Sequence, residues 1–94
     1  MGRREGRSFL ERTADAFDIP ADAVAGLPRI EITGNRELMI ENHRGILEYD
    51  ENLIRINGGR LMIVITGQNL VITAMNQSEL AVAGEIAGIE LETV

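Results

Sequence analysis

The side chains best suited to chemistry stand next to one another at Glu41, Asn42, His43 and Arg44. His43 is the single histidine of the chain, so an imidazole-based metal site would need more acids than its neighbours offer. General-base catalysis would need an orienting acid and a nucleophile, and no Ser, Thr or Cys lies close to His43 in the sequence. We therefore expect no catalytic residue, no metal site and no cofactor.

Two interpretations of this segment remain open. Glu41, Asn42, His43 and Arg44 could form an interaction loop that contacts another molecule. Alternatively, Asn42 and His43 cap a demanding turn through side-chain to backbone hydrogen bonds, with the following glycine supplying an unusual φ. Turn-forming residues are predicted at four places, which are Gly45, Asn57, Gly58 and Gly67.

Apolar residues alternate with polar ones from Arg29 onward, which is the period of a β-strand. Apolar-x-apolar pairs recur every nine or ten residues in the second half of the chain, as in a meander of short strands. The predicted fold is mainly β, an antiparallel meander of about 7–8 short strands in a sandwich or curved roll, with an N-terminal helix. The predicted strands cover 30–32, 38–41, 46–49, 53–57, 61–65, 70–72, 80–82 and 86–91.

One predicted strand is apolar at every position, so we expect both of its faces to be covered. It is either a central strand beneath the N-terminal helix or a strand at a contact between subunits. This candidate core or oligomer strand consists of Leu61, Met62, Ile63, Val64 and Ile65.

The chain divides into a basic flexible tail at 1–7, a helical segment at 8–28 and a β domain at 29–94, all within one domain. Ser8 and Glu11 have the spacing of a capping box, which predicts the start of a helix. The apolar stripe of that helix would pack on the sheet of the same chain, or alternatively bind a partner.

Composition narrows the function classes. The chain of 94 residues has no Cys and a net charge of −6, which argues against a disulfide framework and against nucleic acid as the main partner. No apolar run reaches the ~18 residues of a membrane span, and no apolar segment follows the basic N-terminus as in a signal peptide. A cytoplasmic homo-oligomer is expected.

The run Ile40-Glu41-Asn42-His43-Arg44-Gly45-Ile46, with the later Tyr49, resembles the YabP/YqfC family of sporulation proteins. The patterns Gly67-x-x-Leu70-x-Ile72 and Leu80-x-Val82-x-Gly84-x-Ile86 resemble the rest of that family. Ile19-Pro20 together with Leu27-Pro28-Arg29-Ile30 resembles the YqfC branch. The resemblance implies a role in endospore formation in the mother cell, peripheral to the forespore membrane, with a membrane-bound stage IV sporulation protein as partner. It implies no catalytic activity.

Three functions therefore compete. The favoured one is a non-enzymatic sporulation factor that works through protein–protein contacts, by self-assembly and/or by docking on a membrane-bound sporulation protein. The alternative is a small-ligand or carbohydrate-binding module of the spore envelope, which a concave pocket containing Tyr49, His43 and Arg44 would favour. An enzyme ranks third, since it needs a second acid or a nucleophile beside His43.

Overall fold

A computed structural model describes residues 25–94, which form one antiparallel sheet of six strands. No helix occurs in this part of the chain. The predicted basic tail and the predicted capping box and helix after it lie outside the described residues. The strands are β1 (Arg29–Thr33), β2 (Glu37–Glu41), β3 (Ile46–Tyr49), β4 (Leu53–Asn57), β5 (Leu61–Met75) and β6 (Glu79–Thr93).

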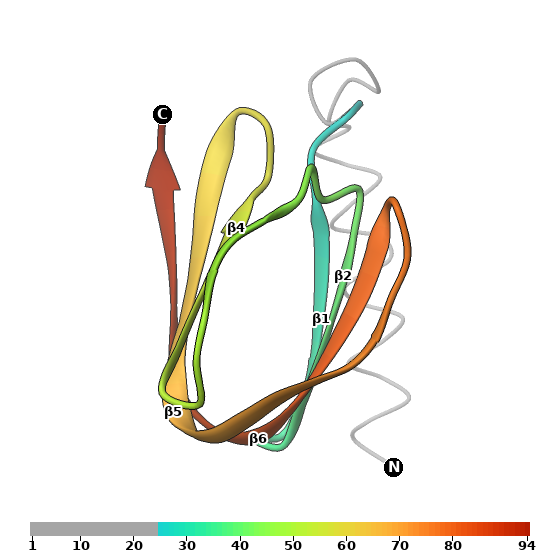
Figure 1. Cartoon of the computed structure of the whole chain (residues 1–94). Coiled ribbons are helices and arrows are strands. Elements are labelled where there is room, and N and C mark those ends of the chain that lie inside the picture. Colours follow the sequence, from blue (N-terminus) through green and yellow to red (C-terminus); the bar gives the residue numbers. More distant parts are fainter. Residues whose placement is uncertain (1–24) are drawn as a thin grey trace, which may run out of the picture.

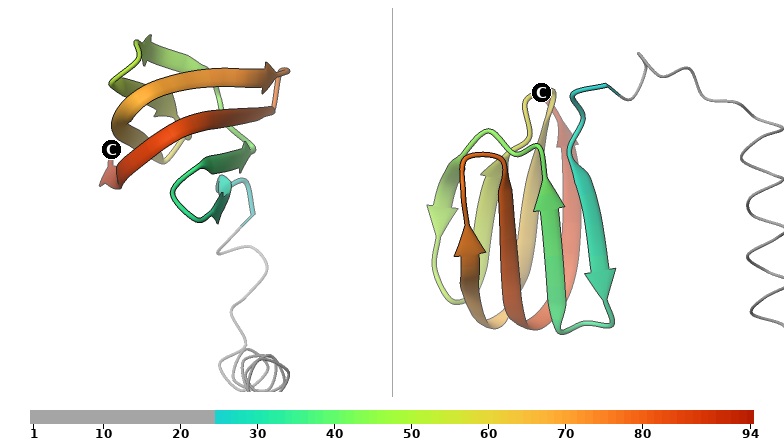
Figure 2. Two further views of the ribbon diagram at one scale, coloured as in Figure 1. Left: turned by 90° about the horizontal axis from the view of Figure 1, so that it is seen from below. Right: turned by 90° about the vertical axis from the view of Figure 1, so that its right-hand side faces the viewer.

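The two longest strands bend the sheet into two layers (Figure 1). The sheet order is β1-β2-β6-β5-β4-β3, and β5 and β6 have 15 residues each. The first half of β6 pairs with β2, whereas the first half of β5 pairs with β4. We call β1, β2 and the adjoining halves of β6 and β5 the β2 layer, which Figure 2 shows face on at the right. The β4 layer contains β3, β4 and the other halves.

Two glycines allow β5 and β6 to bend together. The pairing of β5 with β6 shifts register after Thr66 and again around residues 68–71, so extra residues are accommodated as bulges. A Cβ added at Gly67 would overlap the carbonyl oxygen of Glu85, and one added at Gly84 would lie 2.6 Å from the carbonyl oxygen of Asn69. The two backbones therefore approach each other more closely than side chains would permit.

The core lies between the two layers and is almost wholly aliphatic. Alternate residues of each strand point inward, as the period-2 pattern predicts. Ile40 on β2 and Ile54 on β4 are both completely buried. The buried cluster comprises Leu38, Ile40, Ile54, Ile56, Ile63, Ile65, Leu70, Leu80, Val82 and Ile86.

The mainly β, antiparallel character was correctly predicted, but the number and order of strands were not. The predicted strands at 61–65 and 70–72 are parts of one strand, β5, and those at 80–82 and 86–91 are parts of β6. The expected turn at Gly67 is absent because β5 continues through that residue with a bulge and a bend. Only β3 to β6 form a meander, since β2 pairs with β6 rather than with β3.

The run Leu61–Ile65 is covered on its two faces in different ways. Ile63 and Ile65 are completely buried in the core between the layers. Val64 points to the outer face and is only 6% exposed, because Arg55 and Glu90 lie opposite it on the neighbouring strands. Neighbouring side chains thus shelter Val64 within one chain, and a subunit contact at this strand stays a prediction.

Candidate functional site

Residues 42–45, which we call the crossover, carry the chain from β2 in one layer to β3 in the other. The backbone can turn so sharply because Asn42 has a φ of 67° and Gly45 a φ of 124°. Asn tolerates the left-handed region better than most residues, and glycine enters it without steric cost. The Asn and Gly of this segment are therefore explained by backbone geometry alone.

Backbone hydrogen bonds tie the crossover to both layers. The His43 N–H donates to the Ser78 carbonyl, at 3.2 Å, in the turn between β5 and β6. The Arg44 N–H donates to the Asn57 carbonyl at 2.7 Å, and the Asn57 N–H donates to the Gly45 carbonyl at 2.9 Å. Two consecutive residues therefore bond to opposite layers, which fixes the separation of the layers at this end of the molecule.

The His43 side chain is buried, with 5% of its surface exposed, and both of its ring nitrogens have partners. The Gly45 N–H donates to Nδ1 at 3.0 Å, so Nδ1 must carry a lone pair. Nε2 lies 3.1 Å from the Asn76 carbonyl oxygen and must therefore carry the proton. These contacts require a neutral imidazole with its proton on Nε2, connecting the crossover to the β5–β6 turn.

This arrangement leaves little scope for chemistry at His43. The lone pair that a general base or a metal ligand would use already accepts the Gly45 N–H. Within residues 25–94, no group of three or more His, Cys, Asp or Glu residues is placed to hold a metal ion. The contacts fit the capping interpretation of the segment, with His43 acting as a structural connector.

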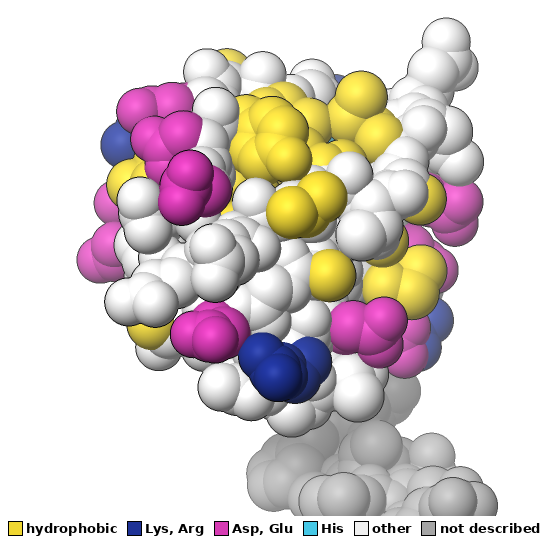
Figure 3. Space-filling model, turned by 60° about the horizontal axis from the view of Figure 1, so that its bottom comes forward, with side chains coloured by type: hydrophobic (Ala, Val, Ile, Leu, Met, Phe, Trp, Pro, Cys, Tyr) yellow, Lys and Arg dark blue, Asp and Glu magenta, His cyan; other side chains and the backbone are white. Residues whose placement is uncertain are grey.

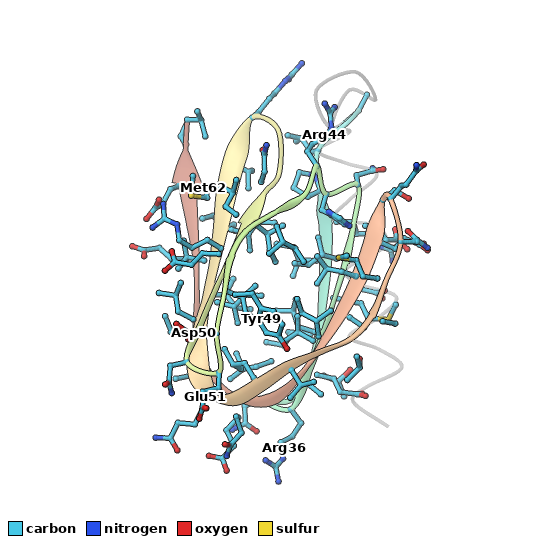
Figure 4. The ribbon with its side chains drawn as sticks, viewed as in Figure 1. Arg36, Arg44, Tyr49, Asp50, Glu51 and Met62 are labelled. Carbon is cyan, nitrogen blue, oxygen red and sulfur yellow. The ribbon has the colours of Figure 1, made fainter. Side chains whose placement is uncertain are left out.

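The other members of the predicted interaction loop do not converge on the imidazole. Glu41 lies on the outer face of β2 and forms an ion pair of 3.9 Å with Arg29. The side chain of Asn42 is exposed and donates to the Leu27 carbonyl at 3.3 Å. Arg44 points away from the core at the end of the molecule (Figure 4) and makes no ion pair with any residue in the range 25–94. Of the four residues, Arg44 is therefore the exposed side chain for which no hydrogen bond or ion pair within residues 25–94 is found.

A shallow groove of about 610 Å³ borders the crossover. One wall is the crossover itself with Ile46, and the other is the β5–β6 turn with Met75, Asn76 and Gln77. Sequence reasoning missed this second wall, although Asn76 could be recognised as a turn residue, because nothing in the sequence places that turn beside His43. Tyr49 does not line the groove.

The remaining predicted turn residues occupy two different environments. Asn57 and Gly58 lie at the turn between β4 and β5, where the Asn57 Oδ1 accepts the Gly59 N–H at 2.8 Å. The Gly58 N–H donates to the Leu61 carbonyl at 2.8 Å and closes that turn. Gly67 instead lies inside β5 at the bend.

The side of the molecule between β3 and the second half of β5 is open and apolar. Figure 3 looks obliquely onto this side, and hydrophobic side chains gather there. Tyr49 points between the two layers (Figure 4), and its hydroxyl accepts the Ile72 N–H at 3.0 Å, linking the two strand edges. Leu47 and Met75 are 55% and 58% exposed.

Comparison with known proteins identifies relatives. The model of the YabP family matches residues 26–94 of this chain. The uncharacterized protein YqfC of Bacillus subtilis (strain 168) is 39% identical over 88 residues, which cover 92% of this chain and 91% of that protein. No solved structure shows a significant match. Both matches confirm the resemblance that the sequence showed.

Proposed function

Since the chain belongs to the YabP family, we propose that it is a non-enzymatic sporulation factor that works through protein–protein contacts. It would act by self-assembly and/or by docking on a membrane-bound sporulation protein. The sporulation role comes from the resemblance at residues 40–46. The surface of residues 25–94 supports the mode of action.

The observation that carries the proposal is the set of unpaired strand edges. Within residues 25–94, β1 and β3 have no strand on their outer sides, so their backbone N–H and C=O groups can pair with another chain. Large apolar side chains accompany these edges, with Ile32 of β1 50% exposed and Leu47 of β3 55% exposed. Edges of this kind suit addition of a strand from another molecule.

The contacts of His43 also favour binding over catalysis. Its two nitrogens hold the crossover against the β5–β6 turn, and no nucleophile is among its hydrogen-bond partners. No helix within residues 25–94 could cross a membrane. In the proposed function, a membrane-bound partner would supply the attachment to the forespore membrane.

The ligand-binding alternative has one supporting observation, which is the groove beside His43 and Arg44. Its walls include Met75 and Ile46, but its aromatic platform is missing because Tyr49 bonds to Ile72 instead. Sugar-binding sites usually offer such a platform together with converging polar groups. The groove therefore ranks below the strand edges as a functional surface.

Two measurements test the proposal. Light scattering of the purified full chain should give a multiple of the 10.3 kDa chain mass across micromolar concentrations. In a spore-forming host that depends on this chain, Arg44→Ala should lower the yield of heat-resistant spores without lowering the amount of protein. A monomer at every concentration, together with normal sporulation of the Arg44→Ala strain, would contradict both routes of contact.

A further inference from the structure

We propose that β1 pairs with β1 of a second copy of this chain, antiparallel and centred on Ile30. The inference rests on the proposed self-assembly and names the surface responsible for it. β1 lies at one edge of the sheet, with β2 on one side and no strand from residues 25–94 on the other. A symmetric dimer formed there would extend the β2 layer of one copy into that of the other.

The backbone of β1 presents the groups that such pairing needs. The Thr33 carbonyl accepts the Arg36 N–H inside the β1–β2 hairpin, so the polar backbone groups of Thr33 point toward β2. Successive residues of a strand point these groups to opposite sides. Ile30 and Ile32 therefore turn their N–H and C=O groups outward. With the axis at Ile30, the two Ile30 residues exchange both backbone hydrogen bonds. Each Ile32 N–H can donate to the Pro28 carbonyl of the second copy, but Pro28 has no N–H to offer to the Ile32 carbonyl.

Charge selects the register. Arg29 and Glu31 lie on the outer face of β1, and Arg29 is opposite Glu41 of β2. The Arg29 guanidinium is 3.9 Å from Glu41 and 3.6 Å from Glu31, and its side chain is 66% exposed. A two-fold axis at Ile30 places Arg29 opposite Glu31 of the second copy, and Glu31 opposite Arg29 of that copy. Each Arg29 would then lie between two carboxylates on adjacent strands.

The neighbouring registers at Glu31 and Ile32 do not place Arg29 opposite Glu31. Opposed residues in an antiparallel pair must face the same side of the sheet. The two-fold axis must therefore lie where a residue is opposite the same residue of the second copy. An axis at Glu31 would place the two Glu31 carboxylates opposite each other, which is repulsive. An axis at Ile32 would place Glu31 opposite Thr33 and leave the charges unmatched.

Burial of apolar surface is compatible with the register that the charges select. Ile32 is on the inner face of β1 and is 50% exposed although its neighbour Ile30 packs against the core. With the axis at Ile30, Ile32 lies opposite Pro28 of the second copy, and the two Ile30 side chains lie opposite each other. The contact would thus cover apolar surface that one chain leaves in water.

The other edges are less suited to self-pairing. On β3, the register shifts at Leu47, so the strand is irregular there. On the second half of β5, the Ile72 N–H is already occupied by Tyr49. The outer face of the last part of β6 carries Glu90 and Glu92, which would repel a second copy.

Charge reversal of the full chain tests the pairing. Arg29→Glu or Glu31→Arg alone turns both attractive cross-copy contacts into repulsive ones, and we expect the dimer Kd to rise about tenfold or more. An equimolar mixture of the two variants restores attraction at both contacts, so it should dimerise as the wild type does. Sedimentation velocity measures each case, and thermal melts establish that each variant folds.

Glu48→Arg is the matched control, since it reverses one charge on the edge strand β3 and should leave the dimer unchanged. If all three single variants associate like the wild type, the β1 contact is wrong while self-assembly stands. If the wild type is a monomer, self-assembly itself fails. If the mixture stays as weak as its components, the Ile30 register is wrong.

Cysteine cross-linking gives the register directly, because the chain contains no native Cys. Arg29→Cys mixed with Glu31→Cys should form a heterodimeric disulfide, because opposed residues in an antiparallel pair lie within disulfide range. Arg29→Cys alone should not, because an axis at Ile30 offsets the two copies of residue 29. Efficient cross-linking of Glu31→Cys alone would place the axis at Glu31 and overturn the proposed register.

Discussion

The two ends of the layered sheet are held together by opposite means. At the crossover end, a buried polar side chain, His43, holds the crossover against the β5–β6 turn. At the bend end, β5 and β6 come into direct backbone contact, because Gly67 and Gly84 have no side chains to keep them apart. A residue with turn-like chemistry can therefore mark either a specific hydrogen-bonded contact, as at His43, or a need for space inside a strand, as at Gly67.

The bend should be the more sensitive end, and Gly67→Ala tests it. The new methyl group would overlap the Glu85 carbonyl, which is held in the sheet and cannot rotate away as a side chain would. We expect a loss of about 3 kcal/mol or more in the free energy of unfolding, a large share of the total for a chain of this size. Urea denaturation followed by circular dichroism measures it.

Gly88→Ala is the control for that measurement. Its methyl group would meet only the hydroxyl of Thr66, at 3.2 Å, and that side chain can change rotamer. A loss below about 1 kcal/mol is expected. Equal losses for the two alanine variants would contradict the close-approach explanation.

The crossover end should respond less strongly, and His43→Ala tests it. The substitution removes the partners of the Gly45 N–H and the Asn76 carbonyl and leaves a small cavity. We expect a loss of about 2–3 kcal/mol in the free energy of unfolding, measured by the same denaturation. The adjacent exposed residue provides the control, since Arg44→Ala should cost less than about 0.5 kcal/mol. Comparable losses for the two variants would show that the imidazole bonds contribute little.

The smallest effect is expected at the open side between the layers, for Tyr49→Phe. Loss of the hydroxyl frees the Ile72 N–H, but water can replace the bond at this exposed edge, so we expect about 0.5–1 kcal/mol. Amide hydrogen exchange should accelerate at Ile72. Exchange at Leu70, whose N–H bonds to the Glu51 carbonyl, serves as the internal reference. Unchanged exchange at Ile72 would mean that the tyrosine does not link the two edges.

Much of the sheet could be read from the alternation of apolar residues. The positions of β2, β3 and β4 match the expected strands closely. For β2 and β4 the reason is that buried and less buried residues alternate, which gives a clear period-2 signal. The bend was misread as a turn because Gly67-Gln68-Asn69 has turn composition. Glycine in the middle of a strand can equally mark a bulge or a close backbone contact, and the sequence does not distinguish them.

The candidate site was anticipated only in part. The residue types at 42–45 indicated a cap or a demanding turn, and local geometry explains both Asn42 and Gly45. The partner of the imidazole, Asn76, is 33 residues away, so no local pattern could reveal it. Glu41 is close to His43 in the sequence, but the alternation of side chains along β2 places Glu41 on the outer face, where it pairs with Arg29.

By itself, the sequence determined the strand-forming segments, the inward-facing aliphatic residues, the crossover turn and the family. These depend on period-2 burial and on the φ preferences of Asn and Gly, which act within a few residues. Only the tertiary structure decided that β5 and β6 are long bent strands, that β2 pairs with β6, and that His43 connects the crossover to the β5–β6 turn. These features depend on contacts between distant segments, which form where a shared core brings the segments together.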